Sequence, residues 1–517
     1  MAVTLGSATL ALLVGGRSSR MGQDKGLLSI KGKPLVIRQI LRLQSFFQEI
    51  FIICSSEEQR ERYEKVLASW TKFLNPIRIV CDESKGERAA YYGLGTALKE
   101  SQNEKVFVLP VDAVGIDRGL VEKLLASNKF PAAYENHPFP SVWLKEHLSH
   151  FPSCEKSILA LLGYFSCAWN LPHASEEKLL QVNLNTVEDV KAYFGEPICD
   201  AWGRHLNYLR LSLTESCNMA CQYCLPKGFP GWENSKFRMP FEQVIKILKV
   251  FRNLGFEKVR FTGGEPTLYP KLLCAIEEAR SLGYETISLT TNGSFIRDLS
   301  ILREAGLTHI NISLDSICED TFFKITGYKQ VSKILELIDQ ALRDRMNVRI
   351  NTVVLRTQNF HELPKLLEWA KSRPLILRFI ELMPTDLHRA YFQENFVSNE
   401  EVQHIVHSLG YAPSSRFNFH EPAGPAALYD HPQHPCRIGF ISPLSCNFCD
   451  QCNRLRVTAQ GKLRLCLFAD QDRALPLEKN IKTIAEEVKA YLLQKQEGHE
   501  LALRKVGNMQ HFRAIGG

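Results

Sequence analysis

Apolar, strand-like runs alternate with helix-length segments along two stretches of this chain. In the first stretch the runs are TLALLVGG, EIFIICSS, IRIVCD and KVFVLPVD. In the second they are KVRFTGGE, TISLTTNG, HINISLD, VRINTVVL and LILRFIELM. Such alternation is typical of parallel sheets covered by helices, so both stretches are predicted to be α/β.

The two stretches meet near FGEPICDAWGRHLN, where Gly-Glu-Pro ends one pattern and the strand-like YLRLSLT follows. A chain of 517 residues is too long for one ordinary core. We place the boundary at residue 198. Several strands of the second stretch end in polar or glycine residues, which suits a partial (β/α) barrel with its site at one mouth.

Composition excludes several classes of protein. A hydrophobic content of 45% with 23% charged residues is that of a folded protein rather than a disordered one. The net charge of +7 is compatible with a small anionic substrate and too weak to argue for nucleic acid. No apolar run is long enough to span a bilayer, so we expect a cytoplasmic protein without membrane contact.

The N-terminal string LLVGGRSSRMGQDKGLL follows an apolar strand and precedes a probable helix. Gly15 and Gly16 allow backbone N–H groups to approach a phosphate, while Arg20 and Lys25 supply positive charge. The spacing is not that of a Walker loop. A glycine-rich turn of this kind is structural about as often as it binds phosphate.

The longer string resembles the nucleotide-binding loop of the molybdenum cofactor guanylyltransferase family. The resemblance implies a Rossmann-like, three-layer α/β/α domain that transfers GMP from GTP to molybdopterin with Mg²⁺. The late motif NLNTVED, with Asn183 and Asn185, also matches. The implied nucleotide contacts are Leu13, Val14, Gly15, Gly16, Lys25 and Asp82, and the implied magnesium ligand and substrate contact is Asp112.

This N-terminal stretch also departs from that family. It reads GERAAYYGLG where a Gly-Pro-Leu-Ala-Gly turn is usual, it has VDAVGI after the last strand, and it lacks an Asn near Cys54. Three alternatives follow: an active guanylyltransferase, a related transferase with altered specificity, or a degenerate structural or regulatory domain.

The string SCNMACQYC places Cys217, Cys221 and Cys224 directly after a strand. Three thiolates on a short loop are able to hold a [4Fe–4S] cluster and leave one iron without a protein ligand. An incomplete zinc knuckle is the alternative from spacing alone.

With FTGGEP, TTNG and NISLD, this group resembles the radical S-adenosylmethionine (SAM) superfamily. The motifs KVRFTGGEPTL, RFIELMP, FCDQCNRLRVTAQGKLRLCLF and a terminal IGG narrow the resemblance to the GTP 3′,8-cyclase family of molybdenum cofactor synthesis. It implies a radical SAM core at 199–430 and an extension at 431–517. The implied SAM contacts are Tyr223, Gly264, Ser313 and Met383. The implied GTP contacts are Arg210, Arg260, Thr290, Arg349, Arg454, Leu455 and Arg456, and the implied catalytic residues are Arg210, Arg260 and the tail residue Arg513.

A second group, Cys449, Cys452 and Cys466, has the spacing C-x2-C-x13-C. The same resemblance implies a second [4Fe–4S] cluster whose open iron binds the guanine of GTP. Cys446 is additional, and spacing leaves three alternatives: a bystander, a fourth cluster ligand, or part of a four-cysteine zinc site. Arg349 stands where lysine is common in the family.

The chain is therefore predicted to combine two enzymes of one pathway. Its expected partners are GTP, molybdopterin, an electron donor such as flavodoxin or ferredoxin, and a second copy in a homodimer. The rival hypotheses are a zinc-dependent nucleotide-binding protein and a cyclase with an inactive N-terminal domain.

Overall fold

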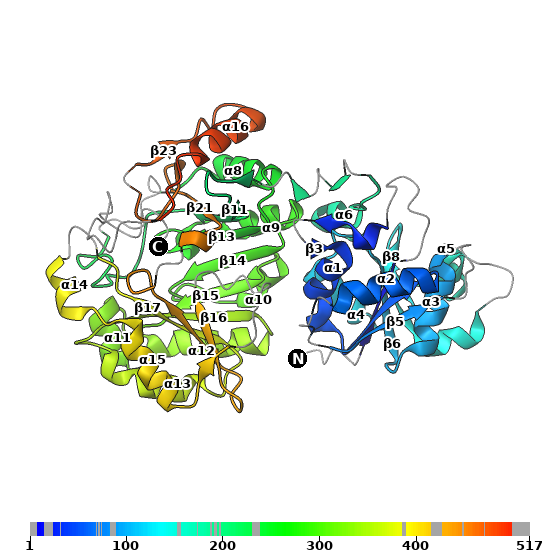
Figure 1. The fold of residues 1–517 in the computed structure, drawn as a ribbon, viewed down its shortest axis with the longest axis horizontal. Coiled ribbons are helices and arrows are strands. Elements are labelled where there is room, and N and C mark those ends of the chain that lie inside the picture. The colour runs from blue at the N-terminus through cyan, green and yellow to red at the C-terminus, as the bar shows by residue number, and fades with distance from the viewer. Residues whose placement is uncertain are drawn as a thin grey trace. The chain divides into compact units, whose positions relative to one another are not determined.

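The chain divides into two compact units, residues 1–193 and 194–517 (Figure 1). The computed structural model describes residues 8–14, 24–30, 33–68, 70, 73, 75–82, 89–151, 157–172, 174–186, 189–190, 194–195, 198–229, 238–384, 389–414, 426–446, 449–469 and 471–498. Gly15, Gly16, Arg20, Arg513 and the terminal Gly-Gly lie outside these residues.

A seven-stranded sheet forms the centre of the N-terminal unit, in the order β5-β4-β1-β6-β8-β7-β9. The strands are β1 Ala8–Leu13, β4 Glu49–Cys54, β5 Ile77–Cys81, β6 Lys105–Pro110, β7 Ala132–Tyr134, β8 His137–Leu144 and β9 Ala168–Asn170. A two-stranded ribbon adds β2 Ser29–Ile30 and β3 Lys33–Pro34. The helices are α1 Leu35–Leu43, α2 Glu57–Ala68, α3 Ala89–Glu100, α4 Arg118–Leu125, α5 Ile158–Tyr164 and α6 Ala174–Leu180.

This sheet is mixed, so the prediction of a purely parallel sheet was wrong in its second half. The four strands expected from the sequence, β1, β4, β5 and β6, are parallel. β8 runs antiparallel to both β6 and β7. Only Glu135 and Asn136 separate β7 from β8, and such a short link returns the chain antiparallel because a parallel partner needs a long crossover. Asn136 takes the positive φ, 63°, that this turn requires.

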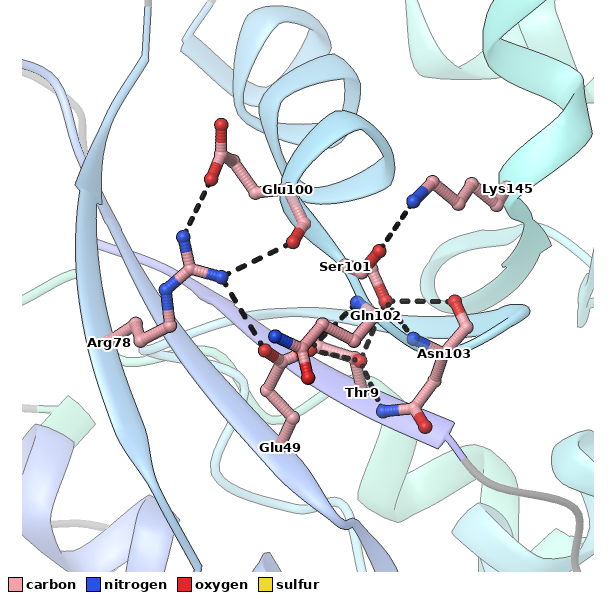
Figure 2. A network of polar contacts seen from close by, with 8 residues as sticks. All are labelled: Thr9, Glu49, Arg78, Glu100, Ser101, Gln102, Asn103 and Lys145. Carbon is pink, nitrogen blue, oxygen red and sulfur yellow. Dashed lines mark hydrogen bonds and ion pairs between the residues drawn. The ribbon is translucent and has the colours of Figure 1, made fainter.

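A polar network closes the amino-terminal edge of this sheet (Figure 2). The buried Glu49 carboxylate accepts hydrogen bonds from the Thr9 hydroxyl at 3.0 Å and the Gln102 amide at 3.2 Å. Arg78 reaches Glu49 at 3.5 Å and Glu100 at 2.7 Å. These bonds satisfy polar groups at strand starts, so this end of the sheet has a structural role, and the functional residues lie at the other end.

A twelve-stranded sheet runs through the C-terminal unit in the order β18-β19-β20-β17-β16-β15-β14-β13-β12-β21-β22-β23. Within this sheet order, the run β20-β17-β16-β15-β14-β13-β12-β21 is parallel throughout. Their bounds are β12 Tyr208–Ser212, β13 Lys258–Thr262, β14 Thr286–Thr291, β15 His309–Ser313, β16 Asn347–Val354, β17 Ile376–Glu381, β20 Arg437–Ile441 and β21 Arg454–Val457. β20 and β21 are the two ends of this parallel run, and they do not pair with each other, so the barrel is open and the predicted partial barrel is confirmed. The six predicted strands, β12 to β17, are confirmed as well.

The remaining strands of this unit are β10 Ile198–Cys199, β11 His205–Leu206, β18 Ala412–Pro413, β19 Ala427–Asp430, β22 Lys462–Arg464 and β23 Arg473–Ala474. Its helices are α8 Phe241–Asn253, α9 Leu272–Ser281, α10 Leu299–Glu304, α11 Glu319–Thr326, α12 Val331–Arg343, α13 Leu363–Ala370, α14 Arg389–Asn395, α15 Asn399–Ser408 and α16 Ile481–Leu492.

The alternation of side chains along the parallel strands sorts apolar from charged residues. Leu209, Leu211 and Leu455 pack in one apolar core with the surrounding helices. Helix α16 lies beside α8 and adds its own apolar face to that core (Figure 1). Residues between these leucines, such as Arg210, face the opposite side, the barrel interior. Among the helices that the structure describes, none has the length and apolarity needed to cross a bilayer.

Candidate functional site

A cavity of about 230 Å³ opens at the carboxyl ends of β12 to β17 in the C-terminal unit. Strands β13 to β17 contribute polar residues to it, and the loop after β12 contributes the cysteines, as expected for an α/β barrel. The lining includes Cys217, Cys221, Tyr223, Cys224, Gly264, Glu265, Thr290, Ser313, Asp315, Asn351, Glu381 and Met383. The cavity therefore gathers all three cysteines of the first group and all four residues that the sequence assigned to SAM.

The first cysteine loop is fixed to helix α11. The amide of Ala220 donates to the carbonyl of Thr326 at 2.8 Å, and the amide of Gln222 donates to that of Ile325 at 2.9 Å. Burial raises the pKa of Cys217 to about 12 and that of Cys221 well above its usual range; Glu265 adds to the first shift and Asp315 to the second. These thiols need a bound cation or cluster to exist as thiolates.

Gly263 and Gly264 bring the end of β13 against the backbone that leads into this loop. A Cβ on Gly264 would stand 2.2 Å from the carbonyl oxygen of Ser216, so no other residue fits there. The amides of Gly264 and Glu265 donate to the carbonyls of Thr214 and Ser216, each at 2.7 Å. The FTGGEP motif thus packs its backbone against the segment that leads into Cys217.

Carboxylates complete the wall of the cavity. Glu265 is buried and accepts bonds from the Asn292 amide at 2.7 Å and the Thr291 hydroxyl at 2.6 Å. The Tyr223 hydroxyl donates to Asp315 at 2.8 Å, and burial raises the pKa of Asp315 to about 6. Sequence reasoning quoted the motifs that contain Glu265 and Asp315 but assigned neither residue a role; their position immediately after a strand was the available signal.

Arginines form a row across three neighbouring strands in the barrel interior. Arg210 on β12 lies opposite Arg260 on β13 and Arg456 on β21. Arg260 is also over the ring of Tyr208, with its guanidinium carbon 5.4 Å from the ring centre. On the other side of the interior, Arg349 on β16 is 2% exposed. The structure therefore groups arginines that are far apart in the sequence.

This grouping is electrostatically costly without an anion. Burial, followed by the charges of Arg456 and Arg260, holds the pKa of Arg210 well below its usual range. Burial and the nearby Arg454 lower the pKa of Arg456 to about 10. A bound polyanion would relieve both effects, because it adds opposite charge beside each guanidinium.

Arg378 on β17 belongs to the same interior and was missed by sequence reasoning. It is 2% exposed and is one of the charges that, after burial and Arg349, lower the pKa of His309. The signal was available in the motif RFIELMP, since Arg378 has the strand parity that faces inward.

Leu455 differs from the arginines beside it. Its side chain is fully buried in the apolar core on the opposite face of β21. The arginines at 454 and 456 have the other parity. Any contact of Leu455 with a substrate would therefore be made by its backbone.

Buried polar atoms also mark space for a ligand. The hydroxyl of Thr290 and the side-chain oxygens of Asn311 and Asn351 have no hydrogen-bond partner among the described residues. Thr290 and Asn311 are register partners on β14 and β15, and Thr290 and Asn351 line the cavity. Groups like these need a polar ligand, so the residues present fit a nucleotide substrate.

The second cysteine group lies on a different loop, around β21 and β22. Burial alone would raise the pKa of Cys452, but the charges of Arg454 and Lys495 outweigh it and lower this pKa to about 7. Cys449, Cys452 and Cys466 are half-buried, whereas Cys446 is exposed. Three thiols with nearby cations fit an anionic iron–sulfur cluster.

Within the described ranges, no three His, Cys, Asp or Glu side chains lie close enough to hold a single metal ion. A four-iron cluster does not require that closeness, because its three cysteine ligands bind three different irons.

A second site lies at the carboxyl edge of the N-terminal sheet. The Lys25 ammonium pairs with Asp112 at 2.6 Å and donates to the side-chain oxygen of Asn185 at 2.9 Å. Asn183 forms a bridge with Ala113, directly after Asp112. The structure thus brings Lys25, Asp112 and Asn185 together from segments up to 160 positions apart.

Leu13, at the end of β1, and Asp82, directly after β5, both lie close to Gly93 of α3. A Cβ on Gly93 would stand 2.9 Å from the Leu13 side chain and 3.8 Å from an Asp82 oxygen. Val14 is the residue after β1, and its amide donates to the carbonyl of Ile53 at 3.1 Å. One carboxylate and one amide oxygen near a lysine fit Mg²⁺, which is commonly bound by few protein ligands together with substrate phosphates.

Comparison with known proteins matches three parts of the chain. Residues 211–370 match the radical SAM superfamily, and residues 375–501 match Molybdenum Cofactor Synthesis C. Residues 10–162 match the MobA-like NTP transferase domain. The two resemblances drawn from the sequence are confirmed.

Individual relatives cover the two units separately. The GTP 3′,8-cyclase of Synechococcus elongatus is 38% identical over 329 residues, which cover 62% of this chain and 99% of that protein. The structure of Streptococcus suis SuiB bound to S-adenosylmethionine is 14% identical, with a TM-score of 0.42, and covers 70% of this chain and 86% of that one. The structure of molybdopterin-guanine dinucleotide biosynthesis protein A from Archaeoglobus fulgidus is 22% identical, with a TM-score of 0.28. The match covers 35% of this chain and 95% of that one.

Proposed function

This chain belongs to the GTP 3′,8-cyclase family, and on that premise we propose that residues 194–517 convert GTP into (8S)-3′,8-cyclo-7,8-dihydroguanosine 5′-triphosphate. The supporting observation is the adjacency of two environments in one barrel. The cavity holds three cysteines and several carboxylates, and the interior beside it holds a row of arginines.

In this proposal the cavity binds a first cluster and SAM. Cys217, Cys221 and Cys224 hold the cluster, and the carboxylates of Glu265 and Asp315 favour the cationic ammonium and sulfonium groups of SAM. When bound, the cluster and SAM supply an organic radical that removes a substrate hydrogen atom. The wall around Tyr223, Gly264, Ser313 and Met383 orients SAM and excludes water.

The barrel interior binds GTP. Arg210, Arg260 and Arg349 face the triphosphate, where planar guanidinium groups make bidentate contacts with phosphate oxygens. Thr290 offers its unpartnered hydroxyl to the nucleoside. The second group, Cys449, Cys452 and Cys466, would hold a second cluster that would supply a binding site for the guanine of GTP, with Arg454 and Arg456 on the same segment. Arg513 is kept as a catalytic proposal that lies outside the described residues.

The test is an anaerobic assay of the full chain with GTP, SAM and a chemical reductant. Formation of 5′-deoxyadenosine together with the cyclised nucleotide is expected, and about eight irons per chain. A preparation that holds zinc without sulfide would contradict the proposal and favour the zinc-dependent alternative. Flavodoxin or ferredoxin as electron donor and a homodimeric assembly remain further proposals.

For the N-terminal unit we propose transfer of GMP from GTP to molybdopterin with Mg²⁺. The convergence of Lys25, Asp112 and Asn185 at the carboxyl edge of the sheet supports this function, since a lysine and a magnesium-binding carboxylate both act on phosphates. Of the departures from the family, only residues 86–88 lie outside the described ranges, whereas residues 89–95 belong to α3 and residues 111–116 follow β6.

Asp112→Ala tests this second proposal, with Glu104→Ala as the matched control. Both residues flank β6, but Glu104 is exposed at the amino end and Asp112 lies at the carboxyl end. Only Asp112→Ala should abolish formation of the guanine dinucleotide cofactor. If the unmodified chain forms none, the proposed GMP transfer is wrong, and the altered-specificity and inactive-domain alternatives remain.

A further inference from the structure

Arg204 is a buried arginine outside both sites described above, and it connects three distant segments. It lies in the turn between β10 and β11 and is 9% exposed. One of its terminal nitrogens donates to the carbonyls of Cys449 at 2.7 Å and Glu497 at 2.6 Å. The other donates to the carbonyl of Gln496 at 2.6 Å. Three of its hydrogen bonds therefore go to main-chain oxygens.

The turn that carries Arg204 is built to hold this guanidinium in one orientation. The fully buried carboxylate of Asp200 pairs with its Nε at 2.6 Å. The other oxygen of Asp200 accepts the amides of Trp202 and Arg204, each at 3.0 Å. Gly203 takes φ +75°, a conformation that favours glycine. Because Asp200 holds the Nε side of the guanidinium, the two terminal nitrogens of Arg204 point at the main-chain carbonyls of residues 449, 496 and 497.

The carbonyl of Cys449 is where this fork meets the second cysteine loop. That oxygen also accepts the amide of Cys452 at 3.1 Å, so it closes the turn between two of the three proposed cluster ligands. A charged donor on this oxygen fixes the turn more strongly than the amide alone. Arg204 thus acts on the spacing between Cys449 and Cys452 without contacting either sulfur.

The third ligand is held from the same C-terminal segment. Lys495 is 4% exposed and donates to the carbonyl of Leu465, the residue before Cys466. The carbonyl of Lys495 in turn accepts the indole N–H of Trp202 at 2.9 Å. Residues 200–204 and 495–497 together therefore hold both ends of the loop.

We propose that Arg204, oriented by Asp200, is a positioning residue that sets the geometry of the second cysteine loop before a cluster binds. The inference rests on the proposed function, because it assigns that loop to a second cluster. It predicts that removal of Arg204 affects the second cluster selectively, since the first loop is fixed by separate bonds to α11.

Arg280 provides a matched control. It has the same exposure, 9%, and it also donates to a main-chain carbonyl, that of Glu304 at 3.1 Å. It lies on α9, and its carbonyl partner belongs to α10 rather than to either cysteine loop. A general loss of stability from removing a buried arginine should therefore appear on substitution of either Arg204 or Arg280. A specific effect on the second cysteine loop should appear only on substitution of Arg204.

The experiment compares Arg204→Met, Arg204→Lys and Arg280→Met in the full chain purified without oxygen. Iron and sulfide content, the electron paramagnetic resonance signal of the reduced chain with and without GTP, and amide exchange of residues 449–466 are measured. For Arg204→Met we expect about four irons in place of about eight. The GTP-dependent change in the signal should be lost, SAM cleavage kept, and exchange in this segment accelerated by about tenfold or more.

Arg204→Lys keeps the charge but not the fork, so intermediate exchange and partial iron content are expected. Unchanged exchange in 449–466, or full iron with the wild-type signal in Arg204→Met, overturns the inference. Equal effects in Arg280→Met also overturn it. If the unmodified chain holds only about four irons, the proposed second cluster is wrong, and the exchange comparison still decides the role of Arg204.

Discussion

The two cysteine groups of the C-terminal unit differ in spacing, C-x3-C-x2-C against C-x2-C-x13-C, and they have opposite electrostatic surroundings. Around the first loop, burial and the carboxylates of Glu265 and Asp315 raise the pKa values of Cys217 and Cys221. Around the second, Arg454 and Lys495 outweigh burial and bring the pKa of Cys452 to about 7. The first pocket is acidic and the second is basic.

This difference indicates what each loop holds besides its cluster. An acidic pocket favours a ligand that carries positive charge, as the sulfonium and ammonium groups of SAM do. A basic pocket favours a polyanion such as GTP. The two cysteine groups thus suit different ligands because the neighbouring segments contribute charges of different sign.

Removal of one cysteine from each loop should separate the two roles most strongly. Cys221→Ala is expected to reduce 5′-deoxyadenosine formation to the level of the uncatalysed control, because SAM loses its cluster. Cys452→Ala should still cleave SAM but form no cyclised nucleotide. Each variant should retain about four irons. Loss of SAM cleavage in both variants would show that the loops do not act separately.

Substitution in the basic region should weaken GTP binding alone. Arg260→Gln removes one charge of the interior row, and truncation of a buried charged contact typically costs about 2–5 kcal/mol, or about 30- to 5000-fold in Kd. Equilibrium dialysis with GTP measures this change. The Kd for SAM in the same preparation is the internal control, and an equal loss for both ligands would contradict the comparison.

Substitution in the acidic region should have the converse, smaller effect. The Tyr223 hydroxyl and the Val353 amide donate to different oxygens of Asp315, at 2.8 and 2.9 Å. Asp315→Asn removes the charge and keeps an oxygen for the Val353 amide, while its new NH2 group faces the Tyr223 hydroxyl, which is able to accept from it. We expect about tenfold weaker SAM binding, typical of one charge-assisted contact. GTP affinity should not change. A larger effect on GTP than on SAM would reverse the assignment of the pockets.

The smallest effect is expected at Cys446. It is exposed, and its amide already donates to the carbonyl of Ser442 at 3.0 Å. Cys446→Ser should leave the iron content and both binding constants unchanged, with a stability change within about 0.5 kcal/mol. A loss of iron on this substitution would make Cys446 a ligand, and zinc in the unmodified chain would revive the four-cysteine alternative.

Motif residues in the loops that follow strands were predictable from the sequence. Lys25 and Asp112, as well as Tyr223 and Gly264, were named from short strings, and the structure places each at the carboxyl edge of its own sheet. The failures have a common origin. β8 was missed because its pairing depends on a two-residue turn, and Arg378 because its inward strand parity, although visible in RFIELMP, does not show which side chains lie around it.

By itself the sequence determined the element types, the division into two α/β units and the cysteine groups, because apolar periodicity and spacing act over a few residues. Only the tertiary structure decided which charges surround each thiol and how the second loop is held. Arg204, Cys449 and Glu497 are brought together across more than 290 positions, and burial turns their contacts into strong ones. Such long-range contacts have no periodic pattern that a sequence would reveal.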